Sequence, residues 1–248
     1  MSARVSYTQV STWRQCPYRW RLKYHLGLKE PEIPAKPGTF DALAMGRAVH
    51  AGIEGADVAE AVAMYEREAG KDEKAAIQIR HAVLAALELP VFAGAHHLEF
   101  ERKIESNAYI GYADVIADGV HVYDIKTTNN AGYLDGTQLL LYASELGREG
   151  AEIQYCSYIV LNKLNPRKRE TAAQYEERFA DYGARVIPVK MDDSQVAAFW
   201  RDAYALSTAE EWPKCPGRLC DWCGYRGNTA TAGSKIPAKT RKETKSNV

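Results

Sequence analysis

Two aspartates and a lysine near the middle of the chain are the residues best suited to chemistry. Asp114 ends the run GYAD (111–114), and the run DIKTT follows at 124–128. On a β-strand, residues i and i+2 point to the same face, so Asp124 and Lys126 project together. Carboxylates bind hard cations such as Mg²⁺, a bound cation activates water, and an ammonium group neutralises charge on a transferring phosphoryl group. The spacing predicts metal-dependent phosphodiester hydrolysis, although such a triplet alone is more often a pair of solvated edge charges.

A hairpin is expected to bring the two aspartates together. Apolar and β-branched residues run through 109–116 and 120–125, and the Asp-Gly pair at 118–119 is a strong signal for a short turn between them. Antiparallel pairing of the two strands would place Asp114 close to Asp124.

Further candidate ligands lie upstream. His50 ends the run GRAVH (46–50) in a predicted helix and is a candidate nitrogen ligand, although a lone histidine is usually structural. Glu99 and Glu101 lie on an alternating segment at 98–104, and either could hold a metal-bound water. The sequence does not separate these two glutamates.

A pair of polar residues lies downstream on a predicted helix. Gln138 and Tyr142 are at positions i and i+4, and therefore on one helical face. Three leucines between them supply the apolar side. The pair either lines the site or marks the boundary of an amphipathic helix.

In this order, the motifs GRAVH, GYAD, DIKTT and Q-x-x-x-Y resemble the RecB-like branch of the PD-(D/E)XK nucleases, which includes CRISPR-associated adaptation nucleases and phage-encoded exonucleases. The resemblance spans roughly residues 5–225. It implies an α/β, restriction-endonuclease-like core, with a mixed central sheet flanked by helices and a helical N-terminal section. It implies Lys126 as the catalytic lysine, with Gln138 and Tyr142 beside it, while Glu101 is a further acidic candidate from its position. The implied metal ligands are His50, Asp114, Asp124 and the carbonyl of Ile125.

Four of the five cysteines predict a second metal centre. Cys215, Cys220 and Cys223 form a C-x4-C-x2-C cluster flanked by proline and glycine, and Cys16 is the better candidate for the fourth ligand. Cys156 lies within an apolar strand and is expected to pack as a small hydrophobe. No signal peptide indicates an oxidising compartment, so metal binding is favoured over disulfides and a reducing, cytoplasmic location is expected.

Sites of four cysteines hold either structural zinc or an iron–sulfur cluster. One cysteine near the N-terminus and three after the nuclease core resemble the iron–sulfur members of the RecB-like branch, whose cluster is [4Fe–4S]. The resemblance therefore favours a [4Fe–4S] cluster over Zn²⁺. Either centre would clasp together the two ends of a single domain at 1–227.

The distribution of charge, rather than its total, points to nucleic acid. The 248 residues carry no net charge, but residues 1–29 contain six basic residues and no acidic one. Basic and aromatic side chains interleave there, a mixture that grips phosphates and stacks on unpaired bases, although a helix with its aromatics in the core has the same pattern. The predicted DNA contacts are Arg14, Arg19, Trp20, Arg21 and Lys23.

The hydrophobic periodicity predicts one domain of mixed α/β structure. Helices are expected at 8–26, 40–54, 57–69, 72–89, 135–147 and 193–209, and strands at 97–105, 108–117, 120–128, 152–162 and 184–190. A loop is expected at 29–39, a charged mobile flap at 165–182, and a disordered basic tail at 228–248. No apolar run reaches the length of a membrane span.

These features predict a DNA exonuclease that uses Mg²⁺ or Mn²⁺ and acts mainly on ends of single-stranded DNA. Repair, recombination, or phage or CRISPR DNA processing is the expected context, with a helicase or recombination protein as the expected kind of protein partner. The alternative is a non-catalytic, DNA-binding subunit on the same scaffold. The presence of Asp114, Asp124 and Lys126 together favours the enzyme.

Overall fold

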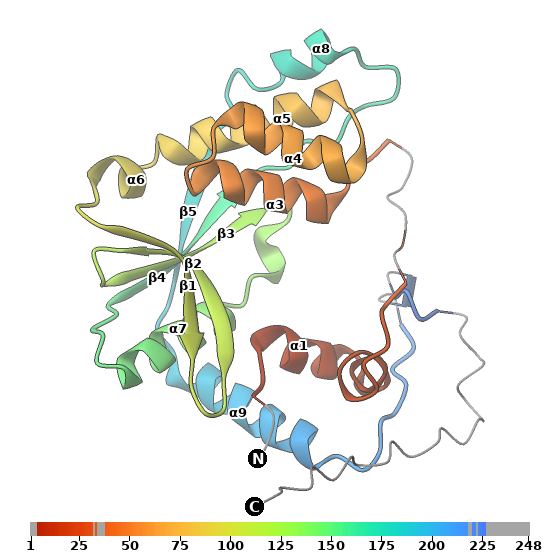
Figure 1. The fold of residues 1–248 in the computed structure, drawn as a ribbon, viewed down its shortest axis with the longest axis vertical. Coiled ribbons are helices and arrows are strands. Elements are labelled where there is room, and N and C mark those ends of the chain that lie inside the picture. The colour runs from red at the N-terminus through yellow and green to blue at the C-terminus, as the bar shows by residue number, and fades with distance from the viewer. Residues whose placement is uncertain (1–3, 32, 34–37, 218–219, 222, 227–248) are drawn as a thin grey trace, which may run out of the picture.

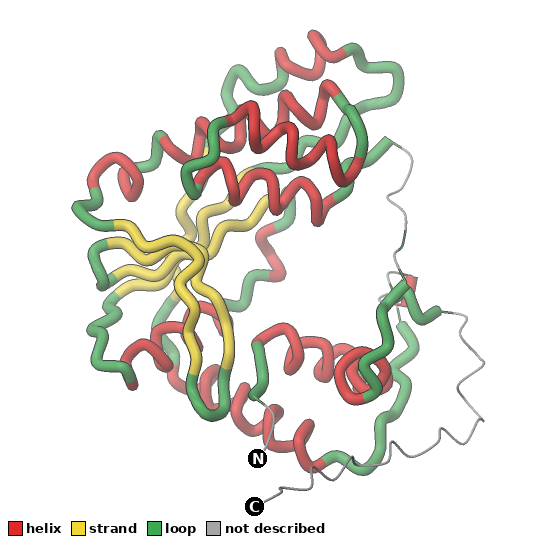
Figure 2. Tube along the Cα trace, viewed as in Figure 1, coloured by secondary structure: helices red, strands yellow, loops and turns green. Residues whose placement is uncertain are grey.

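A five-stranded mixed β-sheet lies at the centre of the protein, between two layers of helices (Figures 1 and 2). The computed structural model describes residues 4–31, 33, 38–217, 220–221 and 223–226. Neighbouring strands are antiparallel except β3 and β4, which are parallel. The predicted mixed sheet is therefore confirmed. In chain order, which is also their order across the sheet, the strands are β1 (Leu98–Glu105), β2 (Ile110–Ala117), β3 (His121–Thr127), β4 (Tyr155–Leu161) and β5 (Ala184–Val189).

The predicted hairpin joins β2 to β3. Asp118 and Gly119 have φ angles of 50° and 68°, the left-handed conformations that a tight two-residue turn requires. The ladder resumes beside this turn with the pair Ala117↔His121. The parallel strand β4 then returns after α7 (Thr137–Arg148), the crossover helix that a parallel connection needs.

Three consecutive helices cover one face of the sheet. They are α3 (Ala42–Ile53), α4 (Val58–Ala69) and α5 (Glu73–Leu87). Asp41, Asp57 and Asp72 each precede one of these helices, and their carboxylates accept hydrogen bonds from the free backbone N–H groups of the first turn. The apolar sides of these helices pack on Ile125 of β3 and its neighbours. A short helix, α6 (Pro90–Gly94), follows and was not expected from the periodicity.

The other face of the sheet packs against α7 and α9 (Asp193–Thr208). Leu139 and Leu141 of α7, Val160 of β4 and Phe199 of α9 are all fully buried in this second core. No helix among the described residues combines the length and apolar character needed to cross a membrane.

The N-terminal section is helical but is not the single helix expected at 8–26. It is divided into α1 (Tyr7–Gln15), α2 (Pro17–Trp20) and a turn of π-helix, η1 (Arg21–His25). Cys16, between α1 and α2, has φ −163° and ψ 103°. Proline disfavours the helical conformation in the residue before it, so Pro17 forces Cys16 into an extended conformation and ends α1.

The predicted mobile flap at 165–182 is wrong in part, because this segment contains a helix and docks on the core. The helix α8 (Ala172–Glu177) begins with a capping box between Thr171 and Gln174. Tyr175 is fully buried, and its hydroxyl donates to Gln78 Oε1 on α5 at 3.1 Å. The predicted tail at 228–248 and part of the predicted loop at 29–39 lie outside the described residues.

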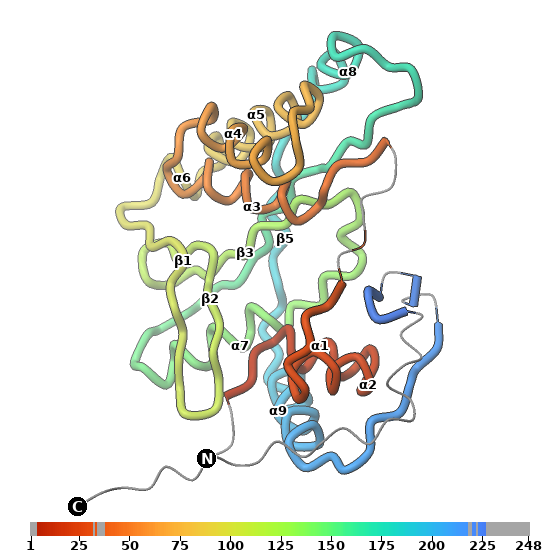
Figure 3. Tube along the Cα trace, turned by 45° about the vertical axis from the view of Figure 1, so that its right-hand side comes forward, coloured from red at the N-terminus to blue at the C-terminus, as the bar shows by residue number. Residues whose placement is uncertain are grey.

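The two ends of the described chain lie side by side, as Figure 3 shows for the helices α1 and α2 and the segment before residue 226. The Tyr18 amide donates to the Pro213 carbonyl at 3.2 Å, and the Tyr225 hydroxyl donates to the Leu28 carbonyl at 2.6 Å. Arg21 lies over the ring of Trp212 at 4.7 Å. These contacts join the segment after α9 to the N-terminal helices.

Candidate active site

The two aspartates lie where β2 and β3 separate. The last pair of the ladder on that side is Val115↔Tyr123, and the next positions in register are Asp114 and Asp124. Asp114 Oδ2 accepts a hydrogen bond from the backbone N–H of Ile125 at 2.7 Å. The carboxylate thus takes the place of a strand carbonyl, and the separated strands leave room for polar groups.

Asp124 and Lys126 form a buried ion pair on one face of β3. Asp124 Oδ2 lies 2.5 Å from Lys126 Nζ, and the aspartate side chain is 1 % exposed. Asp124 Oδ1 is buried without a hydrogen-bond donor. Burial raises the pKa of Asp124 in spite of the nearby ammonium. Burial also opposes the charge on Lys126, but the attraction and hydrogen bond to Asp124, together with the charge of Asp114, outweigh it, and the pKa of Lys126 is raised. The buried carboxylate therefore has a free oxygen for a cation.

Three further groups converge close to Asp124. One ligand atom each from His50, Glu101 and Asp114 lies within 4.8 Å of the other two. His50 Nε2 is 3.9 Å from Asp114 Oδ2 and 3.1 Å from the Ile125 carbonyl oxygen. An imidazole nitrogen, two carboxylates and a backbone oxygen suit a divalent cation such as Mn²⁺ or Mg²⁺. The donor set therefore fits the metal that the sequence predicts.

The structure separates the two glutamates that the sequence left open. Glu99 is engaged by Arg102, whose Nη1 lies 3.0 Å from Glu99 Oε2. Glu101, not Glu99, belongs to the group with His50, and the register of β1 and β2 places it opposite Asp114. Glu101 has φ 48°, a left-handed conformation that costs a non-glycine residue on the order of 1–3 kcal/mol and that clusters at functional sites. Nothing in the sequence signals this backbone angle.

Glu54 is an acidic neighbour of the site that sequence reasoning missed. It is the C-cap residue of α3, one helical turn after His50, with its Oε1 3.9 Å from His50 Nδ1. Burial raises the pKa of Glu54, and the charge of Glu101 raises it further. The i, i+4 spacing from His50 was the available signal, since it puts both side chains on one helical face.

The site is poised to attract a cation. Burial, followed by the charge of Asp124, raises the pKa of Asp114 to about 8, although the hydrogen bond from Ile125 acts in the opposite direction. Several carboxyl groups thus share a site in which they cannot all be ionised at neutral pH. A divalent cation relieves this repulsion, so its binding must release protons.

The predicted helical pair packs against the same strands. Gln138 Nε2 donates to the Tyr142 hydroxyl at 2.7 Å, which confirms that the two side chains share one face of α7. Tyr142 explains the glycine of the GYAD run, because a Cβ on Gly111 would lie 2.7 Å from Tyr142 Cε1 and 2.9 Å from the ring of Tyr109. The glycine lets the helix approach the strand that carries Asp114.

The basic residues predicted to contact DNA are largely paired within the protein. Arg14 Nε lies 2.6 Å from Asp202 Oδ2 on α9. Arg19 and Lys23 share Glu30, at 2.8 and 3.4 Å. The acid-free character of residues 1–29 is therefore offset by Asp202 on α9 and by Glu30, the acid that directly follows this segment.

The prediction that Trp20 contacts DNA is wrong. The side chain is buried at 9 % exposure, with Trp13 in edge contact at a ring-centroid distance of 5.8 Å. A ring enclosed in this way packs in the core and cannot stack on a base. Arg21 lies over Trp212 and stabilises the contact between the two ends of the chain.

The four cysteines of the predicted cluster lie on the two segments that pack together. Cys16 lies at the break after α1, while Cys215, Cys220 and Cys223 follow α9. Among the described residues, no three of these sulfur atoms lie within 4.8 Å of one another, so they are not gathered as they would be around a single ion. Cys156 is 2 % exposed, which confirms its predicted packing role, and burial raises its pKa to about 12.

The fold and this group of residues define a class of metal-dependent nucleases. The chain belongs to the PD-(D/E)XK nuclease superfamily, whose family profile matches residues 4–227. No curated protein matches the chain.

Solved structures that match the chain include one with the same fold and one with a much weaker similarity. A protein from Eubacterium rectale named "putative exonuclease" has a TM-score of 0.63 at 12 % identity, over 94 % of this chain and 90 % of that one. This similarity shows a shared fold. An alkaline exonuclease from Laribacter hongkongensis matches at 12 % identity over 66 % of this chain and 88 % of that one, with a TM-score of 0.34, too low to bear on the fold.

Proposed function

We propose that this protein is a deoxyribonuclease that uses Mg²⁺ or Mn²⁺ and acts mainly as an exonuclease on ends of single-stranded DNA. The observation that carries the proposal is the buried Asp124–Lys126 pair beside the converging group of His50, Glu101 and Asp114. Family membership supports nuclease activity, and the name of the structure from Eubacterium rectale supports the exonuclease mode. We place the protein in the RecB-like branch because of its four ordered motifs.

Each residue of the site has a proposed role. When bound, the metal would lower the pKa of a water molecule and withdraw charge from the scissile phosphate. Lys126, held by Asp124, orients the attacking water and neutralises charge on the phosphoryl oxygens. The hydrogen bond from Gln138 fixes the hydroxyl of Tyr142 beside the strand that carries Asp114. The residues that would hold the metal are His50, Glu101, Asp114, Asp124 and the carbonyl of Ile125.

The preference for ends can be tested with DNA of two shapes. We expect linear single-stranded DNA to be degraded and covalently closed circular single-stranded DNA of the same sequence to resist, because an exonuclease needs an end. Moderate salt keeps phosphate contacts from being screened away. Equal rates on the two shapes would show an endonuclease. Binding to both without cleavage in Mn²⁺ would instead support a non-catalytic, DNA-binding subunit.

We further propose that Cys16, Cys215, Cys220 and Cys223 bind a [4Fe–4S] cluster that clasps the two ends of one domain at 1–227. The contacts between α2 and the segment after α9 support a clasp at this place. Thiol ligands require a reducing compartment, so we propose a cytoplasmic location, with a helicase or recombination protein as partner. None of the five cysteines forms a disulfide.

Anaerobically purified protein is expected to be brown and to contain iron and acid-labile sulfide. Serine at Cys16 or Cys220 should bleach it, because each would supply one thiolate ligand. Cys156→Ser is the matched control and should keep its colour, since that thiol is buried against α7. Stoichiometric zinc without sulfide, in protein from iron-replete cells, would establish the zinc alternative.

Gly46 offers a test of where the DNA passes. It lies one turn before His50 on α3, and nothing lies within 4 Å of the position that its Cβ would occupy. Gly46→Ala should stabilise the protein by about 0.5–1 kcal/mol, as expected inside a helix, and yet slow DNA cleavage by obstructing the approach of the strand.

Gly147→Ala is the control for this substitution, because Gly147 also lies in a helix with open space around it. It should raise the melting temperature to a similar extent without a change in kcat/KM. Equal activity of the two alanine variants would contradict a DNA path along this face of α3.

A further inference from the structure

One large aromatic side chain beside the site is exposed. Tyr133 ends the 3₁₀ turn η2 (Ala131–Tyr133), which connects β3 to α7, and it is 59 % exposed. Trp20, by contrast, packs in the core. An exposed ring near buried catalytic groups is available for contact with a ligand.

The backbone that carries Tyr133 is held in place by its neighbours. Asn130 Oδ1 accepts a hydrogen bond from the Gly132 amide at 3.0 Å, and Thr128 Oγ1 accepts one from the Asn130 amide at 3.1 Å. Ala131, which begins this turn, and Leu134, which follows it, pack against the second core. The turn is therefore anchored on one side and presents the tyrosine on the other.

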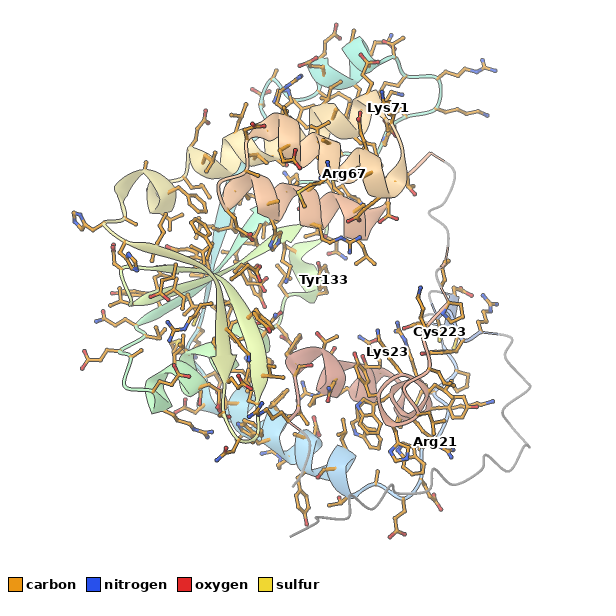
Figure 4. All side chains as sticks on the ribbon, viewed as in Figure 1. Arg21, Lys23, Arg67, Lys71, Tyr133 and Cys223 are labelled. Atoms are coloured by element: carbon orange, nitrogen blue, oxygen red, sulfur yellow. The ribbon has the colours of Figure 1, made fainter. Side chains whose placement is uncertain are left out.

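The exposed ring lies close to the proposed chemistry. Lys126 is the last residue but one of β3 (His121–Thr127), and η2 begins four residues after that strand ends, so Tyr133 lies at the same end of the strand as the lysine. Figure 4 shows Tyr133 on the side of the sheet that faces the N-terminal helices, where Lys23 also lies. A phosphate beside Lys126 would have its nucleotide within reach of this ring.

We propose that Tyr133 stacks on the base of a nucleotide next to the scissile phosphate and thereby positions the single strand. The inference rests on the proposed function and names a contact that selects unpaired bases. An aromatic ring stacks on any base, because every base has a π-face, and each such contact contributes about 1–3 kcal/mol. A paired base has its faces covered by its neighbours in the duplex. Tyr133 therefore favours single strands without reading their sequence.

The test compares Tyr133→Ala, Tyr133→Phe and a control, Tyr204→Ala, on end-labelled single-stranded oligonucleotides. Tyr204 is 71 % exposed on α9, so it controls for loss of a surface tyrosine. We expect Tyr133→Ala to lower kcat/KM about 5- to 150-fold, which corresponds to one stacked base, while Tyr133→Phe and Tyr204→Ala keep the wild-type value. An equal loss in the phenylalanine variant would show that the hydroxyl acts, and would overturn the stacking proposal.

A second set of substrates distinguishes stacking from a general structural role. An abasic nucleotide is placed at each of the first positions from the end. At one of these positions, the abasic nucleotide should slow cleavage by the wild-type enzyme as much as the Tyr133→Ala substitution does. The same abasic nucleotide should not slow the alanine variant any further, because that variant has already lost the contact. If the abasic nucleotide and Tyr133→Ala each lowered the cleavage rate by an independent factor at every position, so that the two factors multiplied, the proposal would be overturned.

Binding separates this inference from the proposed function. The probe is an oligonucleotide with 2-aminopurine at the stacked position. In Ca²⁺ or without metal, the wild-type protein should quench the fluorescence of this base and Tyr133→Ala should not. If the wild-type protein cuts no DNA in Mn²⁺ but this quenching is seen, the proposed nuclease activity fails and the stacking contact stands. If the wild-type protein cuts DNA and both proteins quench equally, only the stacking proposal fails.

Discussion

Replacing Lys126 with alanine is expected to lower the rate of DNA cleavage by roughly 10²-fold or more, the effect of removing one preorganised electrostatic contact. Lys126 Nζ lies 2.5 Å from Asp124 Oδ2, so the substitution removes a cation and also leaves the aspartate buried without its partner. The pKa of Asp124, already raised by burial, then rises further, and the neutral acid is a poor metal ligand. Both effects act in the same direction. Asp124→Ala should therefore be comparably inactive.

The measurement is the single-turnover rate on an end-labelled oligonucleotide in Mn²⁺, with the melting temperature recorded for each variant. Lys103→Ala is the matched control, because Lys103 is also a strand lysine paired with a carboxylate, that of Glu105, but lies at the surface. It should cut DNA at the wild-type rate, because the substitution removes a charge at the surface. Its melting temperature should also change little, since surface substitutions commonly change stability by less than about 0.5 kcal/mol. Wild-type cleavage by Lys126→Ala would show that the motif has been assigned wrongly.

Asp114→Asn is expected to abolish metal-dependent cleavage and to raise the melting temperature of the metal-free protein at pH 8. The pKa of Asp114 is about 8 in the fold, mainly because of burial, against about 3.9 in an unfolded chain. Below pH 4 the group is neutral in both states. As the pH rises to 8 the unfolded chain ionises first, so stability is lost progressively across this window. Asparagine is neutral throughout and avoids this loss, and its Oδ1 can still accept the Ile125 N–H.

The stability curve is measured by thermal unfolding with a chelator at pH 5, 7 and 9. The difference in melting temperature between variant and wild type should grow with pH. Each kcal/mol of stability shifts the melting temperature by about 2–4 °C in a protein of this size. Calorimetric titration with Mn²⁺ should show proton release and an affinity that increases up to pH 8, because the cation must displace the proton on Asp114. Glu99→Gln is the control, since Glu99 lies on β1 outside the ligand group. An asparagine variant that lost stability as steeply as the wild type would refute a proton held on Asp114.

The sequence by itself was sufficient for the parts of the site that depend on local structure. The turn at Asp118 and Gly119 fixed the pairing of two strands, and this register brings Asp114 opposite Asp124. The spacing of Asp124 and Lys126 fixed their common face. Strand alternation and turn chemistry act over a few residues, so the pattern of a short segment contains the whole cause. The helices that flank the sheet were predictable for the same reason, because caps and periodicity are local.

Only the tertiary structure decided which distant residues lie beside the aspartates and the lysine of β2 and β3. Glu101 and Glu99 have similar sequence surroundings, and a left-handed φ together with the competing cation Arg102 separates them. The helix α8 docks through buried Tyr175, a contact across 97 residues of chain to Gln78 that periodicity cannot reveal. Such contacts depend on the arrangement of elements in space, which no local pattern records.

The same physical reason explains the N-terminal section. Its six basic residues form an acid-free segment in the sequence, but folding brings Asp202 against Arg14, and Glu30 between Arg19 and Lys23. The net charge of a segment therefore does not predict the charge around it in the folded protein. An ion pair depends on the distance between two groups and not on their separation along the chain. The spacing of Asp114, Asp124 and Lys126 therefore predicted the phosphodiester chemistry, and only the fold determined which side chains remain exposed to meet the substrate.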